Sequence, residues 1–130
     1  MTDWNAKYFK PEEFACKCGN CGGRSEMDAG TVERLDRLRE RYGKPLAISS
    51  GFRCEKHISE MGKTTVGAHR QGRAVDIPCA GPDAFKLMSL AVELGFTGVG
   101  ISQRAGQPRF IHLDDAPPAE GQPRPTCWSY

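Results

Sequence analysis

The segment that most constrains the fold is residues 67–76, which reads GAHRQGRAVD. It places His69 before a glycine turn, and a short apolar run that carries Asp76 follows, as is typical of a β-strand. A second apolar run, FIHLD at residues 110–114, contains His112. Two imidazoles and one carboxylate leave a coordination position open for water, as a catalytic zinc ion requires. We therefore expect the fold to bring these three side chains together.

The composition is that of one globular domain. The chain has 130 residues, of which 38% are hydrophobic and 26% charged, so a single domain over residues 1–130 with a real core is expected. A net charge of +2, with interspersed charges, does not call for a nucleic-acid partner. No stretch approaches the roughly 20 apolar residues of a membrane span, so no membrane insertion is expected. We expect a monomer.

The amino end lacks the apolar core of a secretory signal. Residues 1–7 read MTDWNAK and include an acidic residue. Signal peptides instead combine a basic start with an apolar run. We therefore expect synthesis in the cytoplasm without a signal peptide and, for a site of action outside it, release by a route other than Sec.

Two helices are predicted from apolar residues at helical spacing. The first covers residues 29–42, with Asp28 as N-cap and Gly43 at its end. The second covers residues 84–94, with Asp83 as N-cap. Its expected core positions are Phe85, Met88, Leu90, Ala91 and Leu94.

Short apolar runs between turn residues predict the strands 46–50, 74–77, 97–102 and 109–114. A loop with glycine and proline separates the last two, which indicates an antiparallel pair. The flanks, a Cys-rich segment at 1–25 and a Pro-rich tail at 115–130, are expected to be mostly irregular, with Trp128 and Tyr130 pinning the tail to the body. The fold class predicted is α+β, a small antiparallel sheet packed with helices.

The six cysteines leave several interpretations open. The residues are Cys16, Cys18, Cys21, Cys54, Cys79 and Cys127. The first three have C-x-C-x-x-C spacing and, with one of the others, would make a structural zinc site; disulfides and free thiols are the alternatives. Because the spacing is not that of a regular zinc ribbon, we favour disulfides or free thiols at this stage.

Three ordered motifs resemble the M15 family of zinc peptidases, the D-Ala-D-Ala carboxypeptidase and phage endolysin group that shares a metal site with lysostaphin-type enzymes and hedgehog. Residues 67–76 match S-x-H-x-x-G-x-A-x-D in all but the first serine. Residues 50–53 match S-G-[YF]-R, and residues 110–114 match the strand that carries the last histidine. The similarity covers about residues 9–115. It implies the zinc fold of hedgehog and the D-Ala-D-Ala peptidases.

The resemblance also implies a site. One catalytic Zn²⁺ would be held by His69, Asp76 and His112, and Arg53 would steady an oxyanion or a substrate carboxylate.

The general base departs from the family pattern. Several members place Glu or Asp three residues before the last histidine, where this chain has Arg109. Asp114, on the same strand face as His112, is then the expected base; the alternative is a carboxylate that orients an imidazole.

The function implied is hydrolysis of the peptidoglycan stem peptide, most simply as an L-Ala–D-Glu endopeptidase of endolysin type in wall lysis or release. The alternatives are a D-Ala-D-Ala carboxypeptidase and a non-catalytic, zinc-containing wall-binding module. Because the substrate is peptidoglycan, we expect the protein to act in the periplasm or cell wall. A holin-like protein is the expected partner for its release.

Overall fold

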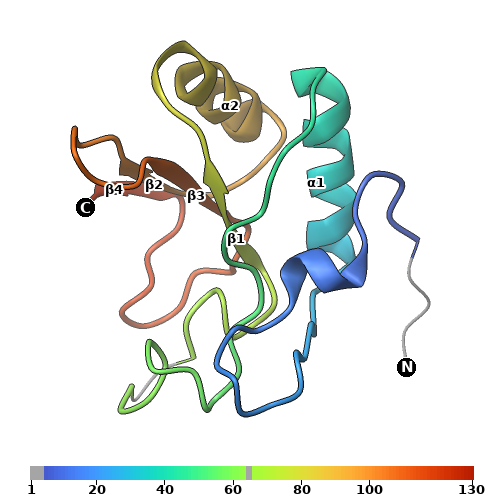
Figure 1. The fold of residues 1–130 in the computed structure, drawn as a ribbon. Coiled ribbons are helices and arrows are strands. Elements are labelled where there is room, and N and C mark those ends of the chain that lie inside the picture. The colour runs from blue at the N-terminus through green and yellow to red at the C-terminus, as the bar shows by residue number, and fades with distance from the viewer. Residues whose placement is uncertain (1–4, 64–65) are drawn as a thin grey trace.

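A computed structural model describes residues 5–63 and 66–130 and has an α+β architecture, as predicted. A short 3-10 helix, two α-helices and four strands follow one another along the chain (Figure 1). They are η1 (Pro11–Phe14), α1 (Ala29–Tyr42), β1 (Ala74–Pro78), α2 (Gly81–Glu93), β2 (Gly98–Ser102), β3 (Phe110–Asp114) and β4 (Thr126–Ser129). The sheet order is β1-β3-β2-β4, and β2 pairs with β4 in parallel while the other pairs are antiparallel. The sheet is therefore mixed rather than wholly antiparallel.

The core lies between the helices and one face of the sheet (Figure 1). Leu35 and Leu38 of α1 and Leu87 of α2 are fully buried there with the strand residues Ile77 and Ile111. Side chains alternate along a strand, so the residues between these apolar positions point to the opposite face. That opposite face carries the polar site.

The first helix begins and ends where the sequence predicts. The carboxylate of Asp28 accepts a hydrogen bond from the backbone N–H of Thr31, and Gly43 ends the helix in the left-handed region at φ 82°. The boundaries and both caps are thus confirmed.

The second helix starts three residues earlier than predicted. Its N-cap is Ala80, and Pro82 lies in the first turn, where a missing N–H costs no hydrogen bond. Asp83 is therefore a first-turn residue and not the cap. Phe85, predicted as core, is 69% exposed, because the face of α2 that packs inward is defined by Ala84, Leu87 and Ala91.

Two further expectations are corrected by the structure. Residues 46–50 form no strand; only Ser50 pairs with the sheet, through an isolated antiparallel bridge to Asp76. In the tail, residues 126–129 form β4, whereas an irregular segment was expected. All six cysteines are free thiols, so the disulfide alternative is not seen.

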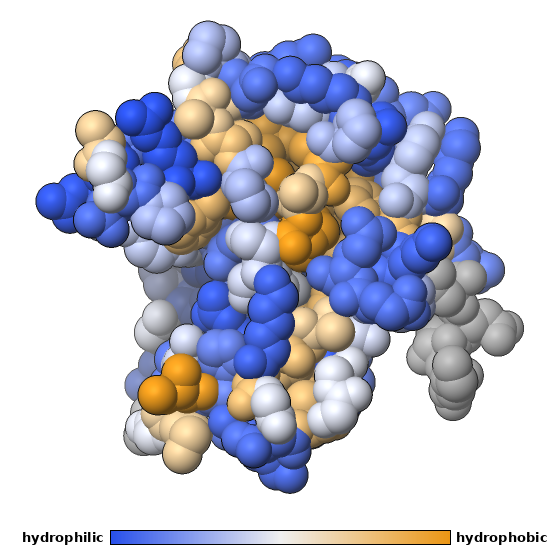
Figure 2. Space-filling view, viewed as in Figure 1, coloured by the Kyte–Doolittle hydropathy of each residue, from blue (hydrophilic) through white to orange (hydrophobic). Residues whose placement is uncertain are grey.

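The surface in Figure 2 is mostly hydrophilic on the face shown, with a hydrophobic strip near its centre. Within the described residues, neither α-helix has the length and apolar character needed to cross a membrane.

Candidate metal centre

The polar face of the sheet is built by cross-strand register. Asp76 of β1 lies directly opposite His112 of β3, and His112 lies opposite Gly100 of β2. Gly100 in turn lies opposite Trp128 of β4. Residues in register project from the same face, so one row across four strands places a carboxylate, an imidazole and an indole side by side.

Two glycines of β2 make room for this row. A Cβ added at Gly100 would lie 2.7 Å from Nε1 of Trp128 and 3.0 Å from Cβ of His112. A Cβ added at Gly98 would collide with the carboxylate of Asp114. The alternating glycines of the sequence TGVGIS therefore serve the site, because any side chain there would displace its residues.

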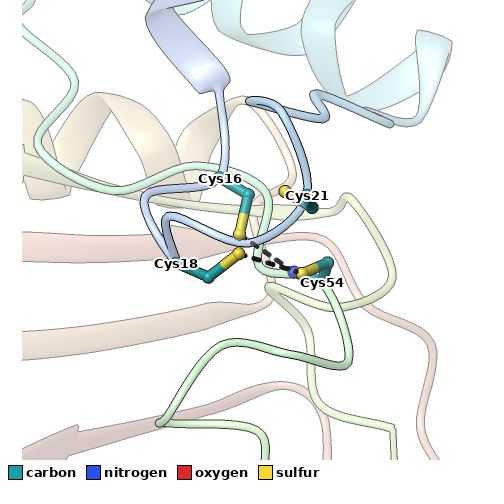
Figure 3. Close-up of side chains that lie close together, drawn as sticks. All are labelled: Cys16, Cys18, Cys21 and Cys54. Carbon is teal, nitrogen blue, oxygen red and sulfur yellow. Dashed lines mark hydrogen bonds between the residues drawn. The ribbon is translucent and has the colours of Figure 1, made fainter.

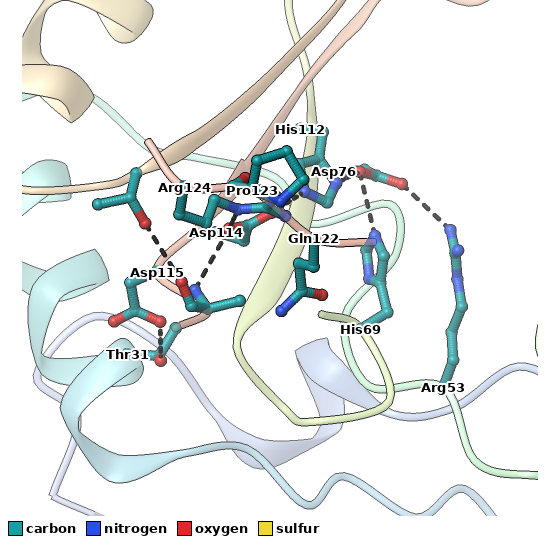
Figure 4. A network of polar contacts seen from close by, with 12 residues as sticks. Thr31, Arg53, His69, Asp76, His112, Asp114, Asp115, Gln122, Pro123 and Arg124 are labelled. Atoms are coloured by element: carbon teal, nitrogen blue, oxygen red, sulfur yellow. Dashed lines mark hydrogen bonds and ion pairs between the residues drawn. The ribbon is translucent and has the colours of Figure 1, made fainter. Parts of the chain in front are cut away.

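His69 reaches this face from a turn outside the sheet. Gly72 has φ +71°, which L-residues rarely adopt, and a Cβ there would strike the backbone of Glu26. The turn directs the His69 ring toward Asp76, as Figure 4 shows. The centroids of the His69 and His112 rings are 5.1 Å apart, with the rings in an edge-to-face arrangement. The three residues predicted as ligands thus meet, and all three are buried.

The donor atoms have the spacing that a zinc ion requires. Nε2 of His69 lies 3.4 Å from Oδ1 of Asp76, and Nδ1 of His112 lies 3.1 Å from the same oxygen. Bonds of 2.0–2.1 Å in a tetrahedron put two donor atoms about 3.3 Å apart. The geometry and the donor types therefore both fit zinc.

Each imidazole is oriented through its other nitrogen. Nδ1 of His69 donates to the carbonyl oxygen of Gly51 at 2.7 Å, which leaves Nε2 free to bind a metal. Nε2 of His112 donates to Oδ2 of Asp114 at 2.7 Å, which turns Nδ1 toward Asp76. Such partners fix both the ring orientation and the tautomer of a ligand.

Asp114 is fully buried and its two oxygens are shared among several donors. Arg124 donates to both oxygens at 2.8 Å, and the N–H of Ala116 donates to Oδ1 at 3.3 Å. Burial alone would raise the pKa of Asp114, but the hydrogen bonds from His112 and Arg124 lower it to about 2. These contacts are those of an orienting carboxylate, the alternative role considered for this residue.

The charges of Asp76 and His112 support each other. Burial opposes ionisation of both groups, yet hydrogen bonds from His112 and His69 lower the pKa of Asp76. The bonds from His112 to Asp114 and Asp76 in turn raise the pKa of His112. The two carboxylates therefore favour the charged form of the His112 imidazole, and a metal bound at Nδ1 would have to displace a proton from it.

Arg53 lies at the edge of the centre. Its Nη2 is 3.3 Å from Oδ2 of Asp76, and its Nε donates to Oγ of Ser50 at 3.2 Å. The side chain is 21% exposed, so one part of the guanidinium holds Asp76 while another faces solvent. His57, the third histidine of the chain, accepts a hydrogen bond from the N–H of Ser59.

Three residues of the tail join the site without having been predicted there. Arg124 pairs with Asp114, and its guanidinium carbon lies 5.4 Å from the centroid of the Trp128 ring. The Trp128 ring centroid is 4.9 Å from that of His112. Burial raises the pKa of Tyr130, whose ring centroid lies 5.1 Å from that of Phe110 on the strand that carries His112. Only the aromatic residues gave a sequence signal, as anchors of the tail.

The pKa of Asp114 predicts an acid-sensitive contribution to stability. A carboxyl whose pKa falls from 3.8 to about 2 on folding stabilises the protein fully above pH 3.8 and progressively less as the pH falls toward 2. The contribution lost is about 2 kcal/mol. Urea unfolding of the metal-free protein measures it: the gap in unfolding free energy between wild type and Asp114→Asn should shrink between about pH 4 and pH 2. Parallel acid curves for the two proteins would refute this.

One sequence comparison identifies relatives. The model of the family described as Peptidase M15 matches residues 7–114, which include all three candidate ligands, Arg53 and Asp114. A search of curated proteins found no match.

Proposed function

Because the chain belongs to the Peptidase M15 family, we propose that it is a zinc-dependent peptidoglycan hydrolase that cleaves the stem peptide between L-Ala and D-Glu. One observation carries the proposal. Nε2 of His69, Oδ1 of Asp76 and Nδ1 of His112 converge, while the other nitrogen of each imidazole is already bonded. Three protein ligands leave an open position, which distinguishes a catalytic from a structural zinc site.

The chain's residues have separate tasks around this centre. When bound, zinc supplies Lewis acidity that polarises a carbonyl group and makes water a better nucleophile near neutral pH. His69, Asp76 and His112 would hold the ion, and Asp76 would supply the negative charge of the set. The carbonyl of Gly51 and the carboxylate of Asp114 keep the two imidazoles aimed.

Arg53 is the group suited to substrate charge. Its guanidinium is held on Asp76 and Ser50 but remains partly exposed beside the ligands. A fixed positive charge there binds a substrate carboxylate or the oxyanion that develops on the scissile carbonyl. We assign Arg53 this catalytic role and Asp114 a positioning role through His112.

The surface next to His69 suits an endopeptidase. A hollow of about 740 Å³ lies between the segment that leads to His69 and the tail segment that leads to Arg124. Its lining includes Lys63 and Gly67 on one side and Glu120 and Gln122 on the other. An endopeptidase needs room for chain on both sides of the scissile bond, and we propose that this hollow receives the chain on one side of it.

Digestion of purified sacculi tests the proposal. Mass spectrometry of the soluble products should show new N-terminal D-Glu and free L-Ala ends, and the activity should be lost with a chelator and restored by zinc. Release of free D-Ala with the L-Ala–D-Glu bond intact would show the carboxypeptidase instead. Full turnover without a divalent metal would rule out both.

A non-catalytic wall-binding module is the second candidate, because a specific observation favours it. In residues 5–63 and 66–130, the carboxylates in contact with the two imidazoles are Asp76 and Asp114, and both are committed to other groups. The position three residues before His112 is the exposed Arg109. Zinc uptake and sacculus binding without any released product would establish this module.

Replacing Arg53 by lysine is expected to lower kcat/KM about 100-fold, because a point charge does not reproduce the planar fork on Asp76 and the substrate. The metal content should stay unchanged, since Arg53 is not a ligand. Arg104→Lys, at an exposed loop position, is the matched control and should leave the rate unchanged. Equal rates for both variants would remove Arg53 from the mechanism.

A further inference from the structure

Four of the six cysteines meet at a second place in the fold, behind the loop that carries Arg53. Cys16, Cys18 and Cys21 come from the irregular segment after η1, and Cys54 directly follows Arg53. Their sulfur atoms all lie within 4.8 Å of one another (Figure 3). Cys16 and Cys54 are buried, and Cys18 and Cys21 are half-buried.

We propose that these four cysteines bind a second metal ion, a structural zinc. Sγ of Cys18 and Sγ of Cys54 are 3.5 Å apart. A disulfide requires about 2.05 Å, whereas zinc–sulfur bonds of 2.3 Å place two sulfurs of a tetrahedron about 3.8 Å apart. Four thiolate ligands fill the coordination sphere, so the ion has no open position and serves the fold.

The surrounding backbone treats the sulfurs as hydrogen-bond acceptors. The N–H of Cys54 donates to Sγ of Cys16 at 3.3 Å, that of Asn20 to Sγ of Cys18 at 3.3 Å, and that of Lys56 to Sγ of Cys54 at 3.4 Å. Hydrogen bonds of this kind stabilise thiolates and hold metal ligands in place. The lysine side chain also brings positive charge, with its Nζ donating to the carbonyl of Asn20. This offsets the negative charge that four thiolates leave around one zinc ion.

The site joins two segments that lack regular structure. In residues 43–63 and 66–73 there is no helix or strand, and Ser50 alone bridges to the sheet. The N–H of Phe52 donates to the carbonyl of Phe14 at 2.9 Å, and a Cβ on Gly51 would lie 2.7 Å from Cα of Phe14. A metal ion bound by the four cysteines would stabilise this contact, because Phe52 packs against Cys16 and Cys54.

The same loop supports the candidate catalytic centre. The carbonyl of Gly51 orients His69, the N–H of Arg53 donates to the carbonyl of His69 at 3.2 Å, and Arg53 holds Asp76. Holding Cys54 in place therefore also holds Gly51, whose carbonyl orients His69, and Arg53, which carries the substrate-binding charge. A small core with few regular elements here is the situation in which a structural metal contributes most.

Metal content tests the site without reference to peptidase activity. Zinc per chain, measured by elemental analysis of protein purified with zinc, should be two in wild type and one in Cys21→Ser. Cys127→Ser, which changes an exposed cysteine outside the cluster, should retain two. If Cys21→Ser fails to fold, Cys21→His provides a second test, because it keeps a metal-binding side chain and should retain two zinc ions per chain.

The spectrum of the cobalt-loaded protein identifies the ligands. Thiolate-to-cobalt charge-transfer bands should appear in wild type and persist in His69→Ala, which removes only the other centre. They should disappear in Cys21→Ser. Absence of these bands from the wild type, or a mass about 2 Da lower per cysteine pair without reductant, would overturn the proposal in favour of thiols or disulfides. Neither result bears on the peptidase reaction, whose failure would show only in the sacculus assay.

Discussion

Replacing His69 by alanine is expected to lower peptidase activity at least about 1,000-fold, because the Lewis-acid contribution of the metal, several kcal/mol, is lost with its ligand. We expect a direct effect on the metal centre, since Nε2 of His69 lies 3.4 Å from Oδ1 of Asp76, the oxygen that His112 also contacts. Initial rates on purified sacculi at saturating zinc measure the effect. In this variant, two of the three candidate ligands, Asp76 and His112, remain.

His57→Ala is the matched control, because this histidine lies in a turn and its ring accepts a hydrogen bond from the N–H of Ser59, whereas the metal-binding group identified among the described residues consists of His69, Asp76 and His112. Its rate should remain within about twofold of wild type. If the two histidine variants are equally active, the metal centre is not the site of catalysis. If they are equally inactive, the turn that contains His57 has a role that the present assignment lacks.

Asp114→Ala is expected to destabilise the protein by about 3–5 kcal/mol. The carboxylate is fully buried, and its removal leaves the guanidinium of Arg124, only 8% exposed, without a counter-charge. It also releases Nε2 of His112. Urea unfolding monitored by tryptophan fluorescence measures the loss, and Trp128 beside Arg124 makes the probe local.

A double variant separates the stranded charge from lost packing. Asp114→Ala combined with Arg124→Met removes both charges and should cost less than Asp114→Ala alone. Asp83→Ala, which breaks an exposed pair with Lys44, is the control and should cost below about 1 kcal/mol. Equal losses in the single and double variants would mean that the unpaired charge of Arg124 adds nothing to the cost of Asp114→Ala.

The helices and most strands were predictable because their signals are local. In α1 the cap Asp28, the apolar spacing and the terminal glycine all agree, and the observed bounds match. The strand expected at 46–50 does not form, because an apolar run forms a strand only where a neighbour pairs with it along its length. Here the pairing is limited to an isolated bridge between Ser50 and Asp76, beside a hydrogen bond from the N–H of Ser49 to the carbonyl of Asp76. β4 was not predicted, because its pairing with β2 joins segments that are distant in sequence.

The grouping of the three candidate ligands was predictable for a different reason. The motif around His69 and Asp76 and the strand of His112 carry the pattern themselves, so the meeting of these three side chains could be expected from the sequence, while their role as ligands stays a prediction. The place of Arg124 in the site was not predictable, because it depends on a tertiary contact between this residue of the Pro-rich tail and Asp114. The same holds for Cys54, whose role depends on which distant sulfurs meet it.

The central claim is that three side chains hold one catalytic ion. Anomalous diffraction at the zinc edge from crystals of the zinc-loaded protein locates every bound ion. We expect a peak about 2.0–2.2 Å from Nε2 of His69, Oδ1 of Asp76 and Nδ1 of His112. Zinc found only among the cysteines, with no density between the two imidazoles, would contradict it.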